Sequence, residues 1–516
     1  MPNLSEILDA FPEIENHRPW PRRLVDAASW RALTELLAEG EISLLGLWGD
    51  AGHVHMAVLA TEPWSIAVAS LACANGKFPS VGRHHAPAIR LERTIHDLFG
   101  HEASGAVDKR PWLDHGRWRL RAPLGQQTPP LGQQTPPLGE RTTPPAYDFV
   151  KNIGEGLHQI PVGPVHAGII EPGHFRFTAN GETIVRLEER LGYVHKGVEG
   201  LMAGAPLARA ARLAARCSGD STVACSLAFS RAVEAAMGVE VLAGAVSVRA
   251  LMAELERLAN HIGDIGAICN DAAFALMLAY CSVLRERILR ACYTGFGHRL
   301  MMDAIVPGGL SVDFGENEAE VIRQLVATVR LAMPQLIELY DDTASLQDRT
   351  AGSGVLKREL ARRFACGGFV GRGSGRSFDA RRDVAYPPYD RLSFDVPVLQ
   401  EGDVNARVWI RIKEVEQSLG LIEQILTSAP SAGRINAEPR ATQACATEGL
   451  ALVEGFRGDI LAWVRVAPDA TIERCHLRDP SWFQWPVLEA AIEGNIVADF
   501  PLCNKSFNCS YSGHDL

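Results

Sequence analysis

The sequence predicts an α+β protein with a small mixed N-terminal domain and a larger, mainly helical C-terminal domain. Two observations carry this prediction. Short apolar runs of strand length cluster before residue 120, whereas apolar residues at helical spacing dominate after residue 240. A proline-rich stretch that disfavours helix and strand separates the two parts. We therefore predict domains at residues 1–120 and 147–516, joined by a linker at residues 121–146.

The predicted N-terminal domain combines strands and helices. Apolar runs bounded by glycine and proline predict three strands, at Leu44–Gly49, His55–Ala60 and Ser65–Ala72. Two further segments have the apolar spacing of amphipathic helices, Trp30–Leu37 and Leu91–Phe99. Together they indicate a small α+β unit.

The predicted linker is a repeat. From Pro123 to Pro145 the chain repeats the heptapeptide LGQQTPP, with a degenerate third copy. Seven prolines without apolar periodicity favour an extended, polyproline II-like conformation. We interpret the segment as a spacer rather than as a ligand for a proline-recognising module.

The C-terminal domain is predicted to begin with a small β hairpin and to continue as a helical bundle. Strands at Phe175–Thr178 and Thr183–Leu187 are joined at Asn180-Gly181, a strong signal for a two-residue hairpin turn. Long helical patterns follow at Val248–Ile268, Phe274–Tyr293, Val321–Tyr340 and Val404–Leu426, with a kink expected at Pro334. Consecutive long helices with short connections favour a bundle core over a parallel sheet.

Composition and charge exclude several classes of protein. The 516 residues are 47% hydrophobic and 22% charged, which is ordinary for globular domains. The net charge of −10 argues against a general nucleic-acid binder. No run of ~18 uncharged apolar residues predicts a membrane span, and the N-terminus does not resemble a secretory signal. We therefore expect a cytoplasmic protein, or one that faces the cytoplasm.

The cysteines indicate reduced thiols. There are eleven, they are scattered, and no CxxC pair occurs. An odd number without local pairs argues against a disulfide framework and against a local zinc or iron–sulfur signature.

Several segments of the C-terminal domain resemble one family. Residues Gly163–Met202 carry the elements G-P-x-H, a hairpin with G-E, and G-Y-x-H-x-G-x-E. This resembles the start of the large subunit of energy-converting, formate hydrogenlyase-type nickel–iron hydrogenases and of the homologous 49-kDa-type subunit of respiratory complex I. Further similar segments follow in order: Glu254–Gly266, Leu284–Ile288, Val306–Gly309, Gly371–Arg381, Glu454–Asp459 and Ile496–Leu516.

The N-terminal domain has a resemblance of its own. The sequence ERTIHDLFG at Glu92–Gly100, followed by RPWLDHGRW, is similar to the 30-kDa-type subunit of complex I. In formate hydrogenlyase-type enzymes that subunit is fused in front of the large subunit, in the order found here.

The resemblance implies a metal site whose ligand motif is broken in this chain. In the family, two CxxC pairs supply four thiolates to nickel, and two of these sulfurs bridge to iron. Gapless matching on the segment Val233–Gly238 and on the C-terminus aligns the ligand positions with Ser218, Ser221, Ser510 and Gly513. Cys217 and Cys225 lie beside the first pair but out of register.

The residues at these positions are poor nickel ligands. A serine hydroxyl does not ionise near neutral pH as a thiol can, and Gly513 has no side-chain donor. Even Cys217, Cys225 and Cys509 together would give three sulfurs rather than four. We therefore expect a member of the family that lacks the nickel ligands and binds no metal cofactor directly.

Complex I also lacks nickel and binds a quinone headgroup through a histidine and a tyrosine. The resemblance leaves two candidates for the histidine, His166 of GPVH and His174 of EPGH. The tyrosine position falls near Gly219, and no tyrosine occurs between Tyr193 and Tyr280. Quinone binding therefore stays a hypothesis with one expected donor missing.

Other residues carry over from the family. Glu171 resembles the glutamate that transfers protons in hydrogenases, and Arg457 matches the arginine above the active-site metal. The alternative for this pair is a buried ion pair that orders the fold. By resemblance, His195 is expected to contact the cluster region of a small subunit, and Ser374–Asp383 is expected to form a subunit contact rather than a solvated face.

The leading hypothesis is a redox subunit of a membrane-associated complex. It would take electrons from an iron–sulfur small subunit, pass them to a quinone-like acceptor, and lie on the cytoplasmic face of the inner membrane through integral, antiporter-like partners. A non-catalytic coupling or assembly scaffold is the main alternative, and hydrogenase activity through displaced cysteines is a third. No glycine-rich fingerprint supports NAD binding by this chain.

Overall fold

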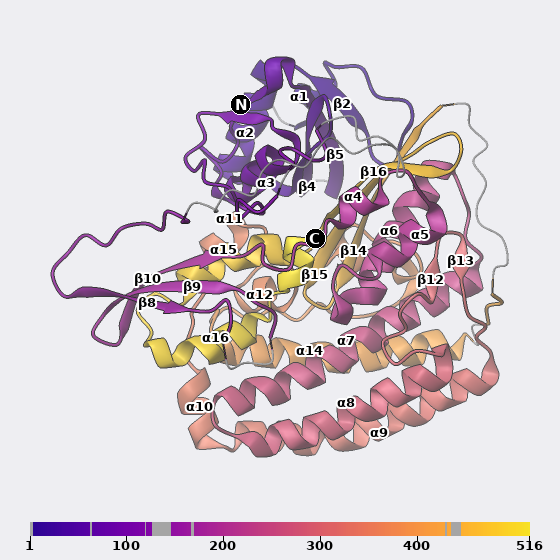
Figure 1. Cartoon of the computed structure of the whole chain (residues 1–516). Coiled ribbons are helices and arrows are strands. Elements are labelled where there is room, and N and C mark those ends of the chain that lie inside the picture. The colour runs from indigo at the N-terminus through magenta and orange to yellow at the C-terminus, as the bar shows by residue number, and fades with distance from the viewer. Residues whose placement is uncertain are drawn as a thin grey trace.

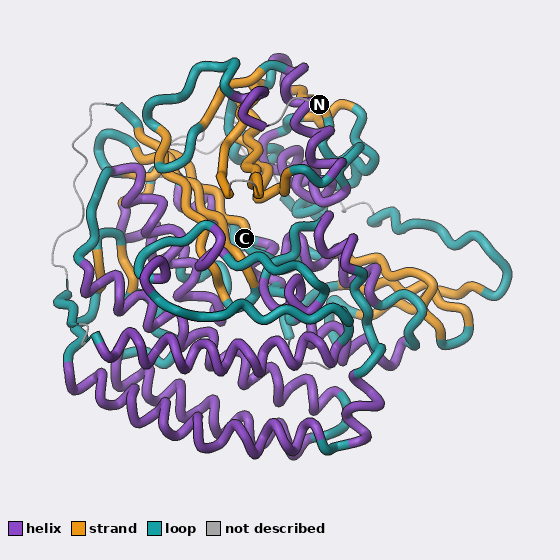
Figure 2. Tube along the Cα trace, turned by 180° about the vertical axis from the view of Figure 1, so that it is seen from behind, coloured by secondary structure: helices purple, strands orange, loops and turns teal. Residues whose placement is uncertain are grey.

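Helices and strands lie in separate layers, which confirms the predicted α+β class (Figure 1). The computed structural model describes residues 4–61, 64–118, 120–125, 146–166, 170–428, 431–434 and 445–516. In Figure 2 a layer of long helices lies below the strands, and the N-terminal part lies above them. The C-terminus of the chain lies between these layers (Figure 1).

The N-terminal part is built on a four-stranded sheet with the order β2-β5-β4-β3. The predicted strands are confirmed as β3 (Ile42–Gly49), β4 (His53–Thr61) and β5 (Trp64–Ala72), which pair antiparallel, whereas β2 (Arg22–Val25) pairs parallel to β5. The two predicted helices are α2 (Ala27–Glu39) and α3 (Ile89–Phe99). Short elements complete this part: α1 (Leu4–Leu8), β1 (His17–Arg18), β6 (Lys77–Pro79) and β7 (Glu102–Ser104).

The predicted hairpin is confirmed and gains a third strand. Strands β9 (His174–Asn180) and β10 (Thr183–Arg190) pair antiparallel, with Asn180 opposite Thr183. Gly181 in the turn has φ +57°, a conformation that glycine adopts without steric cost. Strand β8 (Leu157–Val162) adds to the other edge of β9 and completes the sheet that projects to one side in Figure 1.

The predicted bundle is confirmed. Its helices are α7 (Ala243–Asp271), α8 (Ala275–Phe296), α9 (Glu316–Asp341) and α14 (Val404–Thr427). Helix α7 packs between α8 and α14, and α8 packs on α9. Helix α9 continues through Pro334 as one element. Because the apolar faces of α7 and α14 are almost wholly buried, these two helices form the centre of the C-terminal part.

A central sheet is the element that periodicity does not predict. Strands β14 (Thr447–Gly455), β15 (Gly458–Val466) and β16 (Thr471–Arg478) pair antiparallel, with β1 and β11 (Ala205–Pro206) at the edges. All nine residues of β14 are buried, so the strand lacks the apolar–polar alternation of a half-exposed strand.

The remaining helices and short strands connect these layers. They are α4 (Val198–Met202), α5 (Leu207–Ala214), α6 (Thr222–Met237), β12 (Ile305–Val306), β13 (Gly309–Leu310), α10 (Ala344–Thr350), α11 (Arg358–Arg363), α12 (Gly368–Gly373), α13 (Ala380–Asp383), α15 (Ser481–Ala491), α16 (Phe500–Phe507) and α17 (Tyr511–Asp515). Among the described residues, no helix combines the length and the apolar character needed to cross a membrane.

The N-terminal part and the central sheet are tightly packed together. Strand β1 pairs parallel to β14, and Arg22 of β2 donates to the Glu448 carboxylate at 2.8 Å. The rings of Trp48 and Trp463 pack with their centroids 5.7 Å apart. The domain limits drawn from the sequence stay a prediction, and most of the predicted linker, residues 126–145, lies outside the described residues.

The expected subunit contact at Ser374–Asp383 is wrong for its central charged residues. Asp379 is 1% exposed and Arg381 is 3% exposed, so both lie inside the molecule. Arg381 donates to Asp379 and to Glu254 of α7, and Arg372 of α12 contacts Glu414 and Glu454. A buried network is favourable only when its charges are paired in this way, and here it joins α7, α12, α14 and β14.

The contact between α6 and β14 depends on Gly449. A Cβ at this position would lie 1.9 Å from the Ala232 carbonyl oxygen and 2.7 Å from the Ala236 nitrogen. We expect Gly449→Ala to force the helix from the sheet, to cost ~1–3 kcal/mol or more, and to lower the midpoint of thermal unfolding.

Gly420→Ala in α14 is the matched control for this prediction. A Cβ there would meet no atom within 4 Å, and alanine is favoured over glycine in a helix by about 1 kcal/mol. Circular dichroism melting should therefore show a lower midpoint only for Gly449→Ala, and equal midpoints would contradict the packing described.

Candidate functional site

The residues aligned with the four ligand positions come together in space. Ser218, in the turn before α6, lies 2.9 Å from Ser510, with the distance measured between the two hydroxyl oxygens. The Ser510 hydroxyl caps α17 by accepting a hydrogen bond from the Gly513 nitrogen at 2.9 Å. Ser221 lies one turn of 3₁₀ helix after Ser218, at the start of α6. The two segments are almost 300 residues apart in sequence.

The hydroxyls form a directed chain of hydrogen bonds. Ser218 donates to the Asp220 carboxylate at 2.8 Å, so the proton between the two serines comes from Ser510. The direction therefore runs from the Gly513 N–H through Ser510 and Ser218 to Asp220. Every hydroxyl in the chain donates once and accepts once.

Arg457 holds the other side of this cluster. It lies on the two-residue turn between β14 and β15, and its guanidinium donates to both carboxylate oxygens of Asp220 at 2.7 and 2.6 Å. It also donates to the Ser221 hydroxyl at 3.0 Å and to the backbone carbonyl of Asn508. Arg457 is 3% exposed and packs over the Phe456 ring at 4.5 Å. A bidentate guanidinium–carboxylate pair is among the strongest side-chain interactions.

Each charge of this pair stabilises the ionised form of the other. Burial by itself would raise the pKa of Asp220, but the Arg457 guanidinium outweighs it and holds the pKa below its ordinary value. Burial would likewise lower the pKa of Arg457, and Asp220 reverses that effect. Both groups are therefore ionised at neutral pH.

The cysteines near the cluster are neutral thiols. Cys217, Cys225 and Cys509 are all buried. Burial raises the pKa of Cys217 to about 12 and raises the pKa values of Cys225 and Cys509 well above the ordinary value. None of them occupies a hydrogen-bonded position in the hydroxyl chain described above.

The donor set does not fit a nickel–iron centre. The four aligned positions carry three hydroxyls and a glycine in place of four thiolates. A Cβ on Gly513 would lie 2.6 Å from an Asp479 carboxylate oxygen, so a cysteine side chain there would require that carboxylate to move. Across the described residues, no three or more His, Cys, Asp or Glu side chains are grouped so that they could hold a metal ion.

Glu171 lies at the edge of the cluster but does not pair with Arg457. It is exposed, and its carboxylate accepts a hydrogen bond from the Ser512 nitrogen of α17 at 2.9 Å. The ion pair expected for Arg457 is therefore made with Asp220 instead. Glu171 connects the loop before β9 to the C-terminal helix.

The two candidate histidines have different surroundings. His174 at the start of β9 is buried, which lowers its pKa, and both ring nitrogens are engaged, with the Gly163 carbonyl at 2.9 Å and with Arg176 at 3.3 Å. This histidine orders its own sheet. His166 is half-buried in the preceding loop, directly before residues 167–169, which are not among the described residues.

Sequence reasoning missed two acidic residues of the site. Asp220 lies two residues after Ser218, and its proximity to the broken motif is the signal that could have identified it. Asp264 of α7 accepts hydrogen bonds from Asn508 at 2.9 Å and ion pairs with Lys505 at 3.1 Å and Arg411 at 3.3 Å. It belongs to a segment that resembles the family, but its partners come from distant parts of the chain.

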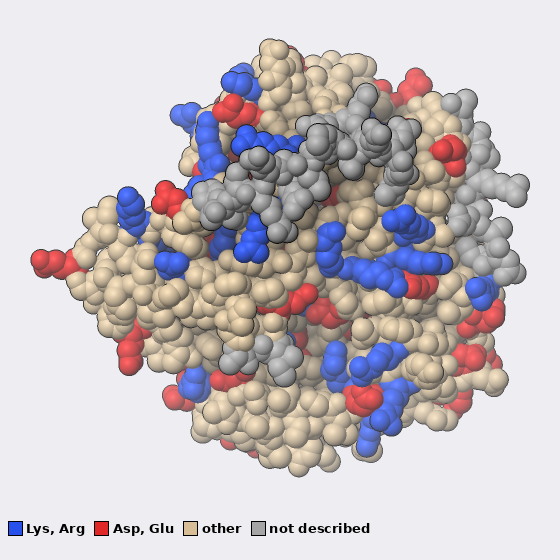
Figure 3. Space-filling view, viewed as in Figure 1, with Lys and Arg blue, Asp and Glu red and all other residues tan. Residues whose placement is uncertain are grey.

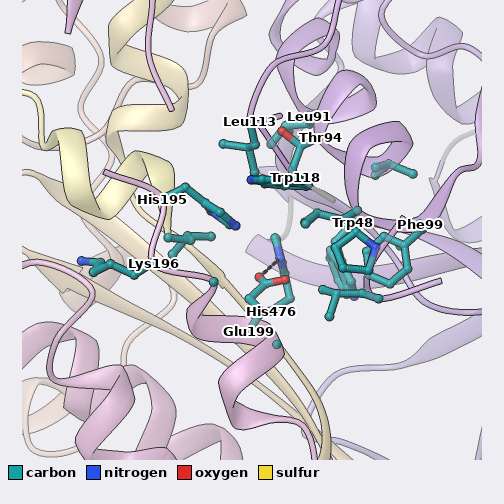
Figure 4. Close-up of a pocket in the computed structure, with 18 of the residues that line it drawn as sticks. Trp48, Leu91, Thr94, Phe99, Leu113, Trp118, His195, Lys196, Glu199 and His476 are labelled. Carbon is teal, nitrogen blue, oxygen red and sulfur yellow. Dashed lines mark hydrogen bonds and ion pairs between the residues drawn. The ribbon is translucent and has the colours of Figure 1, made fainter. Parts of the chain in front are cut away.

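A cavity of about 560 Å³ lies beside this cluster, between the N-terminal sheet and α4 (Figure 4). Its walls are mostly apolar and come from β3, α3, the segment after α3, and α15. The aromatic and large aliphatic side chains include Trp48, Leu91, Ile95, Phe99, Leu113, Trp118 and Trp482. The ring of Trp118 packs on His195 with centroids 5.0 Å apart.

Charged groups form one wall of the cavity. Glu199 of α4 ion pairs with Arg474 of β16 and hydrogen-bonds the His476 ring, both at 2.8 Å. Burial opposes the charge of Glu199, but Arg474 outweighs it and lowers the pKa to about 2. Lys196, also on the cavity, donates to the Cys217 carbonyl at 2.8 Å, directly before Ser218. Lys196 thus connects the cavity to the segment that carries Ser218.

The Arg457–Asp220 pair gives a testable contribution to stability. Asp220→Asn leaves a buried guanidinium without its counter-charge, and because the Asp220 side chain is 35% exposed we expect a loss of about 2 kcal/mol. Since the folded pKa of Asp220 is lowered, the stabilisation is present above ~pH 4 and is lost as the pH falls through the folded value. Urea unfolding of wild type and variant across pH measures this difference.

Asp303→Asn is the matched control, because it removes a carboxylate from the exposed pair with Arg216. We expect a loss below ~1 kcal/mol there. If the free energy of unfolding fell as little in Asp220→Asn as in Asp303→Asn, Asp220 would not be part of a stabilising ion pair. A loss that does not shrink as the pH is lowered would contradict the ion pair as well.

Comparisons with known proteins show which family this chain is similar to. A family model described as the 49-kDa subunit of respiratory-chain NADH dehydrogenase matches residues 271–449. Formate hydrogenlyase subunit 5 of Escherichia coli is 29% identical over 442 residues, which cover 85% of this chain and 77% of that protein. A subunit of the NADH-quinone oxidoreductase of Dehalococcoides mccartyi is 30% identical over 345 residues, which cover 66% of this chain and 92% of that protein.

A solved structure shares the fold as well. One chain of the membrane-bound sulfane sulfur reductase, described as an archaeal respiratory membrane complex, superimposes with a TM-score of 0.66 at 26% identity. The match covers 71% of this chain and 100% of that chain. The chain therefore belongs to the family that comprises the 49-kDa subunits of respiratory NADH dehydrogenase and the large subunits of formate hydrogenlyase-type hydrogenases, and it is a subunit of a membrane-associated oxidoreductase complex of that kind.

Proposed function

We propose that this chain is the nickel-free redox subunit of its complex, and that it carries electrons from an iron–sulfur partner to a quinone-like acceptor. The observation that carries the proposal is the cluster of Ser218, Ser510, Asp220 and Arg457. Its serine hydroxyls stand at aligned ligand positions, and Arg457 and Asp220 form an ion pair beside them. Such groups bind and protonate polar molecules, whereas they are poor ligands for soft metals.

The acceptor chemistry follows from these groups. A quinone takes two electrons and two protons to become a quinol, and both carbonyl oxygens become hydroxyls. The electrons would come from reduced clusters of the partner. In the proposal, the Ser218 hydroxyl turns from Asp220 to donate its one hydrogen bond to a reduced oxygen, while Ser510 still donates to Ser218. Arg457 can stabilise the negative charge that precedes protonation.

Protons would reach this position from the protein surface. Glu171 is exposed and contacts α17 next to Gly513, so it lies where solvent and the cluster meet. Both ring nitrogens of His174 are engaged, with the Gly163 carbonyl and with Arg176, so we assign His174 no part in proton transfer. Glu171 thus takes the role of proton donor in the proposal.

The iron–sulfur partner would bind over the cavity of Figure 4. His195 and Lys196 line this cavity and connect it to the hydroxyl chain, His195 through the Asp515 carbonyl at 2.6 Å and Lys196 through Cys217. An apolar recess with aromatic walls is the usual core of a protein interface. A cluster carried there would be connected through Lys196 to the segment that carries Ser218.

In the complex, the chain would be a peripheral subunit on the cytoplasmic face of the inner membrane, held by integral, antiporter-like subunits. The chain itself would bind neither nucleic acid nor a resident metal. The similar chain of known structure named above is part of a respiratory membrane complex, which supports this arrangement.

A non-catalytic coupling scaffold is the second candidate, and one observation favours it. The cluster is internally satisfied, since the ion pair and the hydroxyl chain use each other as partners. A site that satisfies itself can transmit movement between α6, the β14–β15 turn and the C-terminus without binding an acceptor.

The two candidates differ in the effect of removing the hydroxyls. In the purified complex with loaded clusters, we expect Ser218→Ala/Ser510→Ala to lower the rate of quinone reduction by ~10-fold or more, because the variant loses the Ser218 hydrogen bond to the acceptor and the Ser510 hydroxyl that orients Ser218. Ser418→Ala is the control, since it removes a buried hydroxyl that bonds Glu254 in the bundle, away from the cluster. Sulfane sulfur is assayed as a second acceptor, as the structural neighbour is named for it.

Unchanged rates with every acceptor in the double variant would favour the scaffold. The complex is also purified from cells grown with nickel, and its metal content is measured. Near-stoichiometric nickel in the wild-type chain would overturn the proposal as a whole.

The docking of the partner gives a separate prediction. Trp118→Glu places a charge in the apolar wall of the cavity, and we expect the iron–sulfur subunit to bind ~10-fold or more weakly, as measured by co-purification and by titration of the separated subunits. Trp64→Glu changes a tryptophan of β5 that is 41% exposed and lies outside the cavity lining. Equal retention of the partner by both variants would place its binding site elsewhere.

A further inference from the structure

Helix α8 is apolar on two faces. One face carries Met277, Cys281, Leu284 and Ile288 and is buried against the protein. A second carries Leu276, Tyr280 and Val283, which are 48%, 53% and 56% exposed. A surface helix needs a single apolar stripe to dock on its own protein, and the part of the chain that the structure describes leaves this second face uncovered.

The second face borders a groove between α8 and α9 with a volume of about 800 Å³. The groove is lined from α8 at positions 276, 280, 283 and 287, which have the four-and-three spacing of a coiled-coil seam. From α9 it is lined by Ala332, Leu336, Leu339 and Asp342, which have similar spacing. Each helix therefore offers a seam into which a further helix can pack.

The two helices form an antiparallel hairpin at the outer edge of the molecule. Leu276 at the start of α8 and Thr343 after the end of α9 both line the same groove, and Figure 1 shows the two helices side by side along the lower edge. In Figure 3 few charged side chains are seen over the left half of this edge, where α8 begins and α9 ends. The face is thus accessible and largely uncharged.

The charges that border the groove are opposite at its two ends. Arg287 lies at one end, Asp342 lies at the other beside Leu276, and Glu338 lies one helical turn before Asp342, in the same half of the groove. Within the described part of the chain, none of these three side chains forms a salt bridge, whereas the neighbouring Glu286 pairs with Arg290 and Arg299. The span from Leu276 to Arg287 is ~16 Å at 1.5 Å per residue, about three helical turns.

A groove with a positive end, an apolar middle and a negative end is complementary to itself. A two-fold axis through its centre brings Arg287 of one copy to Asp342 of the other, twice, and brings the two Leu276–Tyr280–Val283 stripes together. Two antiparallel helical hairpins packed in this way make a four-helix bundle, in which each seam is buried. We propose that the α8–α9 face is an interface between two copies of this chain.

The interface is separate from the proposed redox site. Its residues lie on the outer helices of the bundle, whereas the hydroxyl chain lies between α6 and the C-terminus. Dimerisation can therefore be tested independently of electron transfer. It would join two complexes through their peripheral subunits.

The test uses sedimentation velocity on the purified full-length chain and on the purified complex. Wild type is expected at twice the mass of one unit, with a concentration-dependent equilibrium. Val283→Arg should yield single units, because it buries an unpaired charge in the seam. Leu331→Arg is the matched control, since Leu331 is 78% exposed on the same hairpin but does not line the groove.

Charge reversal sharpens the test. Arg287→Asp and Asp342→Arg should each weaken the dimer ~10-fold or more, because each places two like-charge pairs in the interface. The double variant Arg287→Asp/Asp342→Arg should regain the dimer, since its pairs are again opposite. Circular dichroism melting of each variant establishes that it is folded.

Three outcomes would overturn the proposal. Wild type could sediment as a single unit at all concentrations, or Leu331→Arg could weaken the dimer as much as Val283→Arg. The third outcome concerns cross-linking of the variant Val283→Cys in the complex. A cross-link to a helix of another subunit, rather than to a second copy of this chain, would assign the groove to that subunit.

Discussion

The bidentate pair between Arg457 and Asp220 holds together three segments that are far apart in the chain. Arg457 comes from the β14–β15 turn, Asp220 from the turn before α6, and the carbonyl of Asn508 from the segment before the C-terminal helix. The serine hydroxyls complete the junction by linking Ser510 to Ser218 and Ser218 to Asp220. Because the Arg457 guanidinium is buried, the arrangement of all three segments depends on the Asp220 charge that pairs with it.

The sequence alignment made above predicts that this junction lies at the ligand positions of a nickel–iron site. A metal ion bound by four thiolates would fix the same segments through coordination bonds. Here an ion pair and a chain of hydroxyls connect them, and the side chains that remain can hydrogen-bond a polar molecule. The scaffold can therefore be retained while the chemistry changes, which is why the fold by itself does not decide the reaction.

Beneath the junction lies a second, fully buried set of charges. Arg372 contacts Glu414 and Glu454, and Arg381 contacts Asp379 and Glu254, so α7, α12, α14 and β14 share one network. The strongest signs of this network in the sequence are arginines and acids in segments similar to the family. Their burial could not be inferred from composition, because the same residue types usually lie on solvated faces.

Sequence alone determined the elements whose pattern is local. The hairpin at Asn180-Gly181, the strands and helices of the N-terminal part and the four long helices follow from turn chemistry and apolar spacing, and the order of the family-like segments identified the large-subunit family. The central sheet was decided by tertiary structure, because β14 is buried on both faces and shows no alternation. The partners of Arg457 and Glu171 were also decided there. Asp220 and Ser512 are brought to them by packing between segments hundreds of residues apart, and no local pattern in the chain encodes which charges then meet.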